Sequence, residues 1–402
     1  MLRISRMMAS MLQPAAERPF PAAAGPVVIW NLIRRCNLCC EHCYSISADR
    51  DFPGELGTHE AIRVLEDLRQ FQVPALILSG GEPLLRQDVL DIAASAKALG
   101  IGYVGLSTNG TLVDDVMARR VAGAGFDYVG ISIDGRRETH DRVRRQAGAY
   151  DRALRGLRLC RDHGIKVGLR FTLTQRNAED LDHVLGLMEE ERIDRFYLSH
   201  LNYSGRGNVN RAGDAWHTTT RRAMNRIFQE CWAGLSSGRP REFTSGNNDA
   251  DGVLLLQWAR RHLPARAKAL QARLERWGGN ASGVAIANID NLGNVHPDTY
   301  WWDHTLGNVR NERFSDIWTH AHGPLIDGLR ARPRPLKGRC STCTWRGICG
   351  GNTRVRALQV TGDAWQEDPG CYLTDAEIGA DSVRPLLRKG SHGGKAGTVQ
   401  HA

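Results

Sequence analysis

Short apolar runs alternate with amphipathic stretches through the first half of this chain. The apolar runs predict buried strands at Val27–Ile33, Ala75–Leu78, Tyr103–Leu106, Tyr128–Ile133, Val167–Leu173 and Phe196–Leu198. Between them, apolar residues recur every three or four positions, which predicts helices at His59–Phe71, Val89–Leu99, Asp114–Ala124, Tyr150–His163 and Ala178–Glu191. Alternating strands and helices predict an α/β fold, in which helices cover a parallel sheet.

Six strand-and-helix units within residues 26–213 are too few for an eight-fold barrel. The expected core is therefore an open, partial (β/α)6 TIM-like barrel. Residues 1–25 are rich in alanine and proline and have weak periodicity, so we expect an N-terminal arm. Residues 214–280 predict a mainly helical linker region, with a Gly-, Pro- and Asn-rich break at Gly238–Asn248.

The character of the sequence changes after Gly279. A polar, aromatic hairpin and a cysteine-rich loop predict a small C-terminal domain at residues 281–380. Residues 381–402 are rich in Gly, Lys and His, a composition typical of a disordered tail. A chain of 402 residues suits this division into one large and one small domain.

The net charge of +9 would permit binding to nucleic acid or to an anionic surface. The arginines are spread along the whole chain, so we expect a solvated basic surface and neither nucleic acid nor a membrane as a partner. No stretch approaches the ~18 apolar residues that cross a bilayer. The short apolar stretch near the N-terminus is interrupted by Gln13 and Pro14, which argues against a signal peptide.

Seven of the ten cysteines fall into two tight groups. In a long chain without a convincing export signal, such grouping argues for bound metal rather than disulfides, and for a reducing compartment such as the cytoplasm. Cys160 and Cys231 lie in helical patterns and are expected to be small core residues.

The first group has the spacing Cys36-x3-Cys40-x2-Cys43. Three thiolates on one loop can hold three irons of a [4Fe–4S] cluster and leave the fourth iron open. The loop follows the first predicted strand, at the end of the sheet where α/β active sites lie. A zinc site with Cys39 or His42 as fourth ligand is the alternative, and the spacing alone leaves both open. In the cluster reading Cys39 is a bystander thiol.

The loop resembles the signature of the radical S-adenosylmethionine (SAM) superfamily, which has an aromatic residue beside the last cysteine, here Tyr44. Further matches follow the next predicted strands in the order that this superfamily would show: Ser79–Pro83, Ser107–Gly110, Ser132–Gly135 and Arg170. The resemblance covers roughly residues 27–200 and implies the partial barrel that the periodicity predicts independently. It also implies that SAM binds the open iron and is cleaved to a 5′-deoxyadenosyl radical.

The resemblance assigns contacts to SAM. Glu82 would contact the ammonium group, Asp134 would lie near the ribose, and Arg170 would pair with the carboxylate. The full set of implied cofactor-binding residues is Tyr44, Gly80, Gly81, Glu82, Pro83, Ser107, Asn109, Ser132, Asp134 and Arg170.

The second group reads Cys340-x2-Cys343-x5-Cys349 and is followed by Cys371. Four thiolates can saturate a [4Fe–4S] cluster. A zinc ribbon more often pairs two C-x2-C units and stays the alternative. Beside a radical SAM core, the group resembles the auxiliary-cluster domains of the SPASM/Twitch type. The resemblance implies a second [4Fe–4S] cluster in a small Twitch/SPASM-like domain.

The turn Gly293–Asp298 carries His296 where a full SPASM domain would have a cysteine. One auxiliary cluster is therefore expected, as in the shorter Twitch form. His296 has two readings: a turn histidine that faces solvent, or a ligand or proton donor over the barrel mouth.

Several longer segments resemble the NirJ-like family of haem d1 biosynthesis proteins: Asn31–Cys36, Tyr44–Asp49, Asp51–Leu56, Gly293–Asp298, Trp301–Trp302 and Leu306–Arg310. This resemblance implies an iron tetrapyrrole substrate, 12,18-didecarboxysirohaem, whose propionates are removed where haem d1 carries oxo groups. It also implies an electron donor such as flavodoxin or ferredoxin. Trp301, Trp302 and Arg310 would supply stacking and charge pairing, with core packing as the alternative for the tryptophans.

Three other functions remain possible on the sequence. The first is a sirohaem-derived haem synthase that decarboxylates propionates. The second is a SPASM-type peptide maturase, which would often carry an N-terminal peptide-binding domain, and residues 1–25 are too short for one. The third is a non-catalytic iron–sulfur carrier, which would have no use for the SAM-contact positions.

Overall fold

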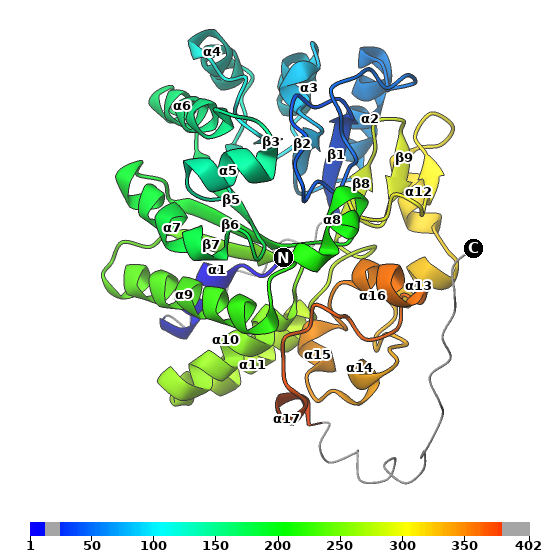
Figure 1. Cartoon of the computed structure of the whole chain (residues 1–402). Coiled ribbons are helices and arrows are strands. Elements are labelled where there is room, and N and C mark those ends of the chain that lie inside the picture. The colour runs from blue at the N-terminus through cyan, green and yellow to red at the C-terminus, as the bar shows by residue number, and fades with distance from the viewer. Residues whose placement is uncertain (13–24, 380–402) are drawn as a thin grey trace, which may run out of the picture.

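A computed structural model describes residues 1–12 and 25–379, which are built around one ten-stranded sheet (Figure 1). The strands are β1 (Val27–Ile33), β2 (Leu76–Gly80), β3 (Val104–Thr108), β4 (Tyr128–Ser132), β5 (Val167–Leu173), β6 (Arg195–His200), β7 (Glu242–Gly246), β8 (Ile286–Ile289), β9 (Asn294–His296) and β10 (Gly307–Asn308). Strands β1 to β7 are parallel neighbours in chain order. Strand β8 adds in parallel to the other edge of β1, and β9 and β10 follow antiparallel.

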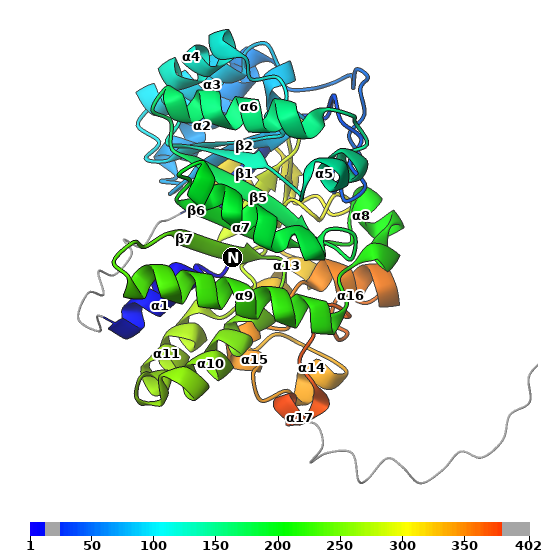
Figure 2. The same cartoon turned by 60° about the vertical axis from the view of Figure 1, so that its left-hand side comes forward.

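Several helices connect consecutive parallel strands and cover the outer face of the curved sheet, and others lie in the C-terminal region. The helices of the described residues have the following bounds. They are α1 (Ile4–Leu12), α2 (Thr58–Gln70), α3 (Val89–Ala98), α4 (Asp115–Gly123), α5 (Arg137–Arg144), α6 (Ala149–Asp162), α7 (Leu181–Glu190), α8 (Gly205–Val209), α9 (His217–Ser236), α10 (Ala250–His262), α11 (Pro264–Trp277), α12 (Phe314–His320), α13 (Pro324–Arg330), α14 (Arg339–Thr342), α15 (Arg346–Cys349), α16 (Arg354–Thr361) and α17 (Asp375–Ile378). Figure 2 shows α6, α7 and α9 running alongside one another on this outer face.

The predicted partial barrel is confirmed. The six predicted strands are β1 to β6, and the five predicted helices are α2, α3, α4, α6 and α7. Their apolar residues form one continuous core, in which residues such as Leu78, Leu106, Val129 and Phe171 are almost completely buried. Parallel strands covered on both faces read as apolar runs, which is why the sequence pattern located them.

A seventh parallel strand lies where the sequence predicted a break. Strand β7 has one large apolar residue, Phe243, so it gives no apolar run. It is a strand because it pairs with β6 in register, with Phe243 opposite Phe196. The expected linker region 214–280 therefore contributes a strand to the barrel as well as helices α9, α10 and α11.

The expected N-terminal arm contains a helix. Ile4, Met7, Met8 and Met11 of α1 are buried, and α1 packs on β7, α9 and α11. The backbone of Leu2 pairs with Ser245 of β7. Residues 13–24, and the tail predicted at 381–402, lie outside the described residues.

The C-terminal region begins inside the barrel sheet. Strands β8 to β10 continue the sheet beyond β1, so the domain boundary predicted at residue 281 falls within one continuous sheet. Helices α13 to α17 then gather beyond β7 and β8, where the curved sheet is open (Figure 1). Within residues 1–12 and 25–379, no helix has the length and apolar content to cross a membrane.

Candidate active site

A cavity opens at the carboxyl ends of the parallel strands, and most of the predicted site residues line it. The cavity and its solvent-filled mouth together have about 950 Å³ of empty space. The predicted residues in its wall are Cys36, Cys40, Cys43, Tyr44, Gly80, Gly81, Ser107, Asn109, Ser132 and Arg170. Glu82, Pro83 and Asp134 are not part of the wall.

The first three cysteines lie together on the loop after β1. Cys36 and Cys40 are buried, Cys43 is half-buried, and the three pack with Leu38 and Ala149. Burial raises the pKa of Cys40, whereas a hydrogen bond with Ser45 helps to hold the pKa of Cys43 below its usual value despite burial.

Hydrogen-bond donors approach the sulfur atoms of this loop. The backbone N–H of Leu38 donates to Cys36 Sγ at 3.4 Å, and Asn109 Nδ2 lies 4.0 Å from the same sulfur. Arg144 Nη1 donates to Cys40 Sγ at 3.5 Å. Donors to sulfur stabilise thiolates, the form in which cysteine binds iron. The donor set and the arrangement therefore fit the three cysteine ligands of a [4Fe–4S] cluster.

The two glycines after β2 allow this strand end to contact the cysteine loop. Gly80 has φ +143°, and a Cβ on it would lie 2.3 Å from the carbonyl oxygen of Ile33. A Cβ on Gly81 would lie 2.2 Å from the carbonyl oxygen of Arg35. Both approaches are to backbone atoms that cannot turn away. The glycines therefore set the position of the cysteine loop as well as the wall of the cavity.

Glu82 holds two strand ends together. Its carboxylate is fully buried and accepts hydrogen bonds from Leu84 N at 3.1 Å, Thr108 Oγ1 at 2.7 Å and Asn109 N at 2.8 Å. Burial raises the pKa of Glu82, against the effect of these hydrogen bonds. Because both oxygens have protein donors, Glu82 fixes the loop after β3, and its predicted contact with the SAM ammonium stays a prediction.

Positive charge dominates the cavity. Arg144, Arg170 and Arg206 line it, and none of the described Asp or Glu residues does. In the described part of the chain, the Arg170 guanidinium has no carboxylate partner. The guanidinium lies over the face of Tyr197, with its Cζ 4.9 Å from the ring centroid. Arg206 anchors the cysteine loop by donating to the carbonyl oxygens of Cys40 and Ser47, each at 2.7 Å. Such a cavity suits ligands that carry carboxylates.

Asp134 lies behind the cysteine loop. Its carboxylate is completely buried, with Arg144 Nη2 at 2.6 Å and His42 Nε2 at 3.4 Å. Although burial works in the opposite direction, Arg144 and His42 hold the pKa of Asp134 below its usual value. The predicted contact between Asp134 and the SAM ribose stays a prediction, while its pairing with Arg144 is a feature that the sequence did not indicate.

Two tyrosines from distant parts of the chain meet at the cavity. The rings of Tyr44 and Tyr300 are 5.4 Å apart, edge to face. Tyr44 donates to Asn31 Oδ1 at 3.1 Å, and Asn247 Nδ2 donates to the hydroxyl of Tyr300 at 2.7 Å. The sequence analysis missed Tyr300, Asn247, Arg144 and Arg206, because only the folded topology brings these isolated residues to the cysteine loop.

The second cysteine group gathers in the C-terminal region. Cys340 is on α14, Cys349 ends α15, and Cys343 and Cys371 lie in the adjoining loops. Burial raises the pKa of Cys349 well above its usual value, and the other three thiols are close enough to add to this shift. Within the described residues, no three His, Cys, Asp or Glu side chains are grouped as a single metal ion would require.

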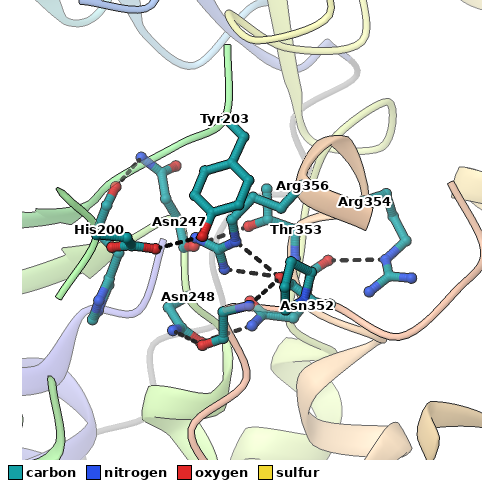
Figure 3. A network of polar contacts seen from close by, with 12 residues as sticks. His200, Tyr203, Asn247, Asn248, Asn352, Thr353, Arg354 and Arg356 are labelled. Atoms are coloured by element: carbon teal, nitrogen blue, oxygen red, sulfur yellow. Dashed lines mark hydrogen bonds and ion pairs between the residues drawn. The ribbon is translucent and has the colours of Figure 1, made fainter. Parts of the chain in front are cut away.

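A polar network fixes the second cysteine group to the ends of β6 and β7 (Figure 3). Asn352, just after Cys349, donates to Asn248 Oδ1 at 2.7 Å. Arg356 makes two hydrogen bonds of 2.9 Å with Asp368, just before Cys371, and a third with the carbonyl oxygen of Leu201. Thr353 donates to the carbonyl oxygen of Asn247 at 3.0 Å. The side chain of Asn247 in turn reaches Tyr300 in the cavity wall.

His296 is neither solvent-facing nor part of the cavity wall. His296 is only 1% exposed. Its Nδ1 lies 2.9 Å from the carbonyl oxygen of His304, and its Nε2 lies 3.4 Å from Asp290 Oδ2. The expectation of a solvent-facing turn histidine is therefore wrong. A role as ligand or proton donor stays a prediction, and both ring nitrogens already have partners in the hairpin.

Two residues expected to meet the substrate are used by the protein itself. Arg310 binds Glu60 at 2.8 Å and the carbonyl oxygens of Gly54 and Leu292, so it clamps surface loops together. Trp301 is buried and donates to Ser282 Oγ at 3.0 Å, which is the core-packing alternative.

The chain is similar to known proteins along most of its length. The profile of the Radical SAM superfamily matches residues 30–188. The pre-heme d1 synthase of Dinoroseobacter shibae is 54% identical over 395 residues, which cover 96% of this chain and 97% of that protein. The Fe-coproporphyrin III synthase of Methanosarcina barkeri is 42% identical over 357 residues, 88% of this chain and 89% of that protein.

Among solved structures, SuiB of Streptococcus suis bound to its precursor peptide SuiA has a TM-score of 0.69, with 16% identity, over 87% of this chain and 76% of that one. At this identity, the likeness concerns the fold alone.

Proposed function

The chain belongs to the radical SAM superfamily, and we propose that it removes propionate side chains from 12,18-didecarboxysirohaem, towards the oxo groups of haem d1. The observation that carries the proposal is the identity with a pre-heme d1 synthase over nearly the full length of both proteins. The cavity supports it, because it brings together three cysteines, a glycine-lined strand end and Arg170, which has no carboxylate partner in the described part of the chain.

When bound, a [4Fe–4S] cluster with one open iron and SAM would supply a 5′-deoxyadenosyl radical, which can abstract hydrogen from an unactivated propionate carbon. In this proposal Cys36, Cys40 and Cys43 hold three irons. Arg170 pairs with the SAM carboxylate. This assignment is supported because Arg170 has no carboxylate partner among the described residues. Tyr44 and Tyr300 close the wall of the cavity next to the cysteine loop.

We further propose that Cys340, Cys343, Cys349 and Cys371 hold an auxiliary [4Fe–4S] cluster. Four thiols would saturate the cluster, so it is suited to accepting or passing an electron rather than binding SAM. The network of Figure 3 would hold this cluster at a fixed position relative to the cavity. An external donor such as flavodoxin or ferredoxin would reduce the first cluster. The free state of all described cysteines fits a reducing compartment, for which we propose the cytoplasm.

Arg34 replaces Arg310 as our candidate for recognising the substrate. Its guanidinium lies 4.9 Å from the centroid of Phe52 and 5.9 Å from that of Trp302, and in the described residues it has no carboxylate partner. It comes two residues before Cys36. A tetrapyrrole is flat, aromatic and anionic through its carboxylates, so a cation flanked by aromatic rings matches its chemistry.

The test is anaerobic incubation of the reconstituted protein with SAM, a reductant and one candidate substrate at a time. With 12,18-didecarboxysirohaem, we expect 5′-deoxyadenosine to form well above the substrate-free rate and mass spectrometry to show loss of propionate carbon. The second candidate is decarboxylation on a related tetrapyrrole, which the similarity to a coproporphyrin-forming enzyme favours. Stimulation by that tetrapyrrole alone, or by a peptide alone, would overturn the proposal.

A further inference from the structure

A buried arginine contacts the sulfur of the second cysteine in the loop. Arg144 is the last residue of α5, and 9% of its side chain is exposed. Its Nη1 donates to Cys40 Sγ at 3.5 Å, while its Nη2 lies 2.6 Å from Asp134 Oδ2. The family resemblance would place Asp134 near the SAM ribose, but it assigns no role to Arg144 or to the pairing of the two residues.

The surroundings of Arg144 hold its guanidinium in place. The Asp134 carboxylate is completely buried, and its other oxygen accepts the backbone N–H of Thr172 on β5 at 2.8 Å. The backbone N–H of Asp134 donates to His140 Nδ1 at 3.1 Å. Asp134 is therefore fixed from two sides. If Arg144 left Cys40, the buried carboxylate would lose its arginine and keep only His42, 3.4 Å away, as an ionic partner.

We propose that Arg144 sets the reduction potential of the cluster held by Cys36, Cys40 and Cys43, with Asp134 as the positioning residue that keeps it on the sulfur. This inference rests on the proposed function. Reduction adds one negative charge to a cluster that three thiolates already make anionic. A buried cation that donates a hydrogen bond to one of these sulfurs favours the reduced form, and the low local dielectric strengthens the effect.

The reduction potential of the cluster determines which electron donors can reduce it. SAM is cleaved only by the reduced cluster, so a higher potential lets a weaker biological reductant populate the active state. The Arg144 guanidinium, and not the Asp134 carboxylate, makes the hydrogen bond to Cys40 Sγ. The pair therefore presents its positive end to the cluster although its net charge is zero.

The test is a redox titration of the reconstituted holoenzyme followed by EPR, using the cluster signal that changes when SAM is added. Arg144→Met alone removes the arginine partner of the buried Asp134 carboxylate and risks loss of the fold. The main variant is therefore Arg144→Met with Asp134→Asn, which removes both charges. Arg145→Met is the control, because Arg145 is 49% exposed and 3.8 Å from Glu41.

For the double variant, we expect the one-electron reduction equilibrium to fall at least tenfold, which corresponds to a midpoint about 59 mV lower. The loss of SAM cleavage relative to wild type should be larger with a weak reductant than with a strong one. If the reduction equilibrium constant of the double variant stays within threefold of the wild-type value at full iron content, the inference is overturned and the ion pair has a purely structural role. A wild-type protein without any SAM-sensitive cluster signal would instead contradict the proposed function.

Discussion

At the scale of single residues, the cavity depends on groups whose environment leaves them one role. Gly81 has backbone carbonyl oxygens where a side chain would begin, and Glu82 accepts hydrogen bonds from three donors. Arg170 has no carboxylate partner among residues 1–12 and 25–379. The sequence identified Gly81 and Glu82 because they belong to a short motif, and it identified Arg170 by its position on the fifth predicted strand. It could not identify Arg144 or Tyr300, since neither stands in a motif and each reaches the cysteine loop only through the fold.

Gly81→Ala should disturb the first cysteine loop. The new Cβ would lie 2.2 Å from the Arg35 carbonyl oxygen and 2.6 Å from that of Arg34, so the loop must shift. Because a shift of about 1 Å in a reacting centre can cost about a hundredfold in rate, we expect cleavage of SAM to fall at least tenfold. Gly102→Ala is the control, since nothing lies within 4 Å of its Cβ position. Wild-type cleavage by Gly81→Ala would show that the close approach is unimportant.

Arg170→Met should weaken SAM binding. A charge-assisted hydrogen bond to the SAM carboxylate contributes about 1.5–3 kcal/mol, so the dissociation constant should rise about tenfold or more. Equilibrium dialysis with the reconstituted protein measures this directly. Arg152→Met is the control on the exposed side of α6, where Arg152 bonds the Ala147 carbonyl oxygen. An unchanged dissociation constant would remove Arg170 from the SAM site.

At the scale of elements, hydrophobic pattern and structure agree where strands are buried on both faces and differ where they are not. Strands β1 to β6 read as apolar runs, whereas β7 has only Phe243 as a large apolar residue and ends the parallel part of the sheet. Helix α1 spans only Ile4–Leu12. Its buried residues Ile4, Met7, Met8 and Met11 follow the helical spacing, but the Ala- and Pro-rich residues after it weaken the periodicity of residues 1–25 taken together. Strand β7 and helix α1 are stabilised by contacts with distant parts of the chain, and the local sequence pattern does not show such contacts.

Helix α12 shows the same dependence on distant partners. Asp67 on α2 accepts hydrogen bonds from Ser315 N at 2.9 Å, Ser315 Oγ at 2.8 Å and Arg313 Nε at 3.0 Å. Asp67→Ala should lower the free energy of unfolding by about 2 kcal/mol, because it leaves the start of α12 without its acceptor. Glu66→Ala, an exposed neighbour on the same helix, is the control for a urea denaturation series. Equal midpoints for the two variants would contradict this account of how α12 is held.

At the scale of the whole molecule, one sheet and one polar network join the two cysteine groups. The sequence predicted both groups and the barrel that carries the first. It could not predict their relative position, since this depends on contacts such as Arg356 with Asp368 and Asn352 with Asn248. The C-terminal region is thereby held at the open side of the barrel, next to the cavity.

Asp368→Asn should break the polar network that holds the second cysteine group at a fixed position relative to the first. Removing one partner of a buried ion pair typically costs about 3–5 kcal/mol, because Arg356 is left as an unpaired buried charge. We expect iron to fall from about eight to about four per chain, the content of one cubane cluster. Asp363→Asn, at an exposed pair with Lys337, is the control and should keep its iron. Full iron content in Asp368→Asn would show that the network does not hold the auxiliary site.

The claim on which the account depends is that Cys36, Cys40 and Cys43 bind the cluster that cleaves SAM. The most direct measurement is 5′-deoxyadenosine formation by the reconstituted triple variant Cys36→Ala, Cys40→Ala and Cys43→Ala, together with its iron content. We predict no 5′-deoxyadenosine and retention of about four irons, those of the other cysteine group. Production of 5′-deoxyadenosine at the wild-type rate by this variant would contradict the account.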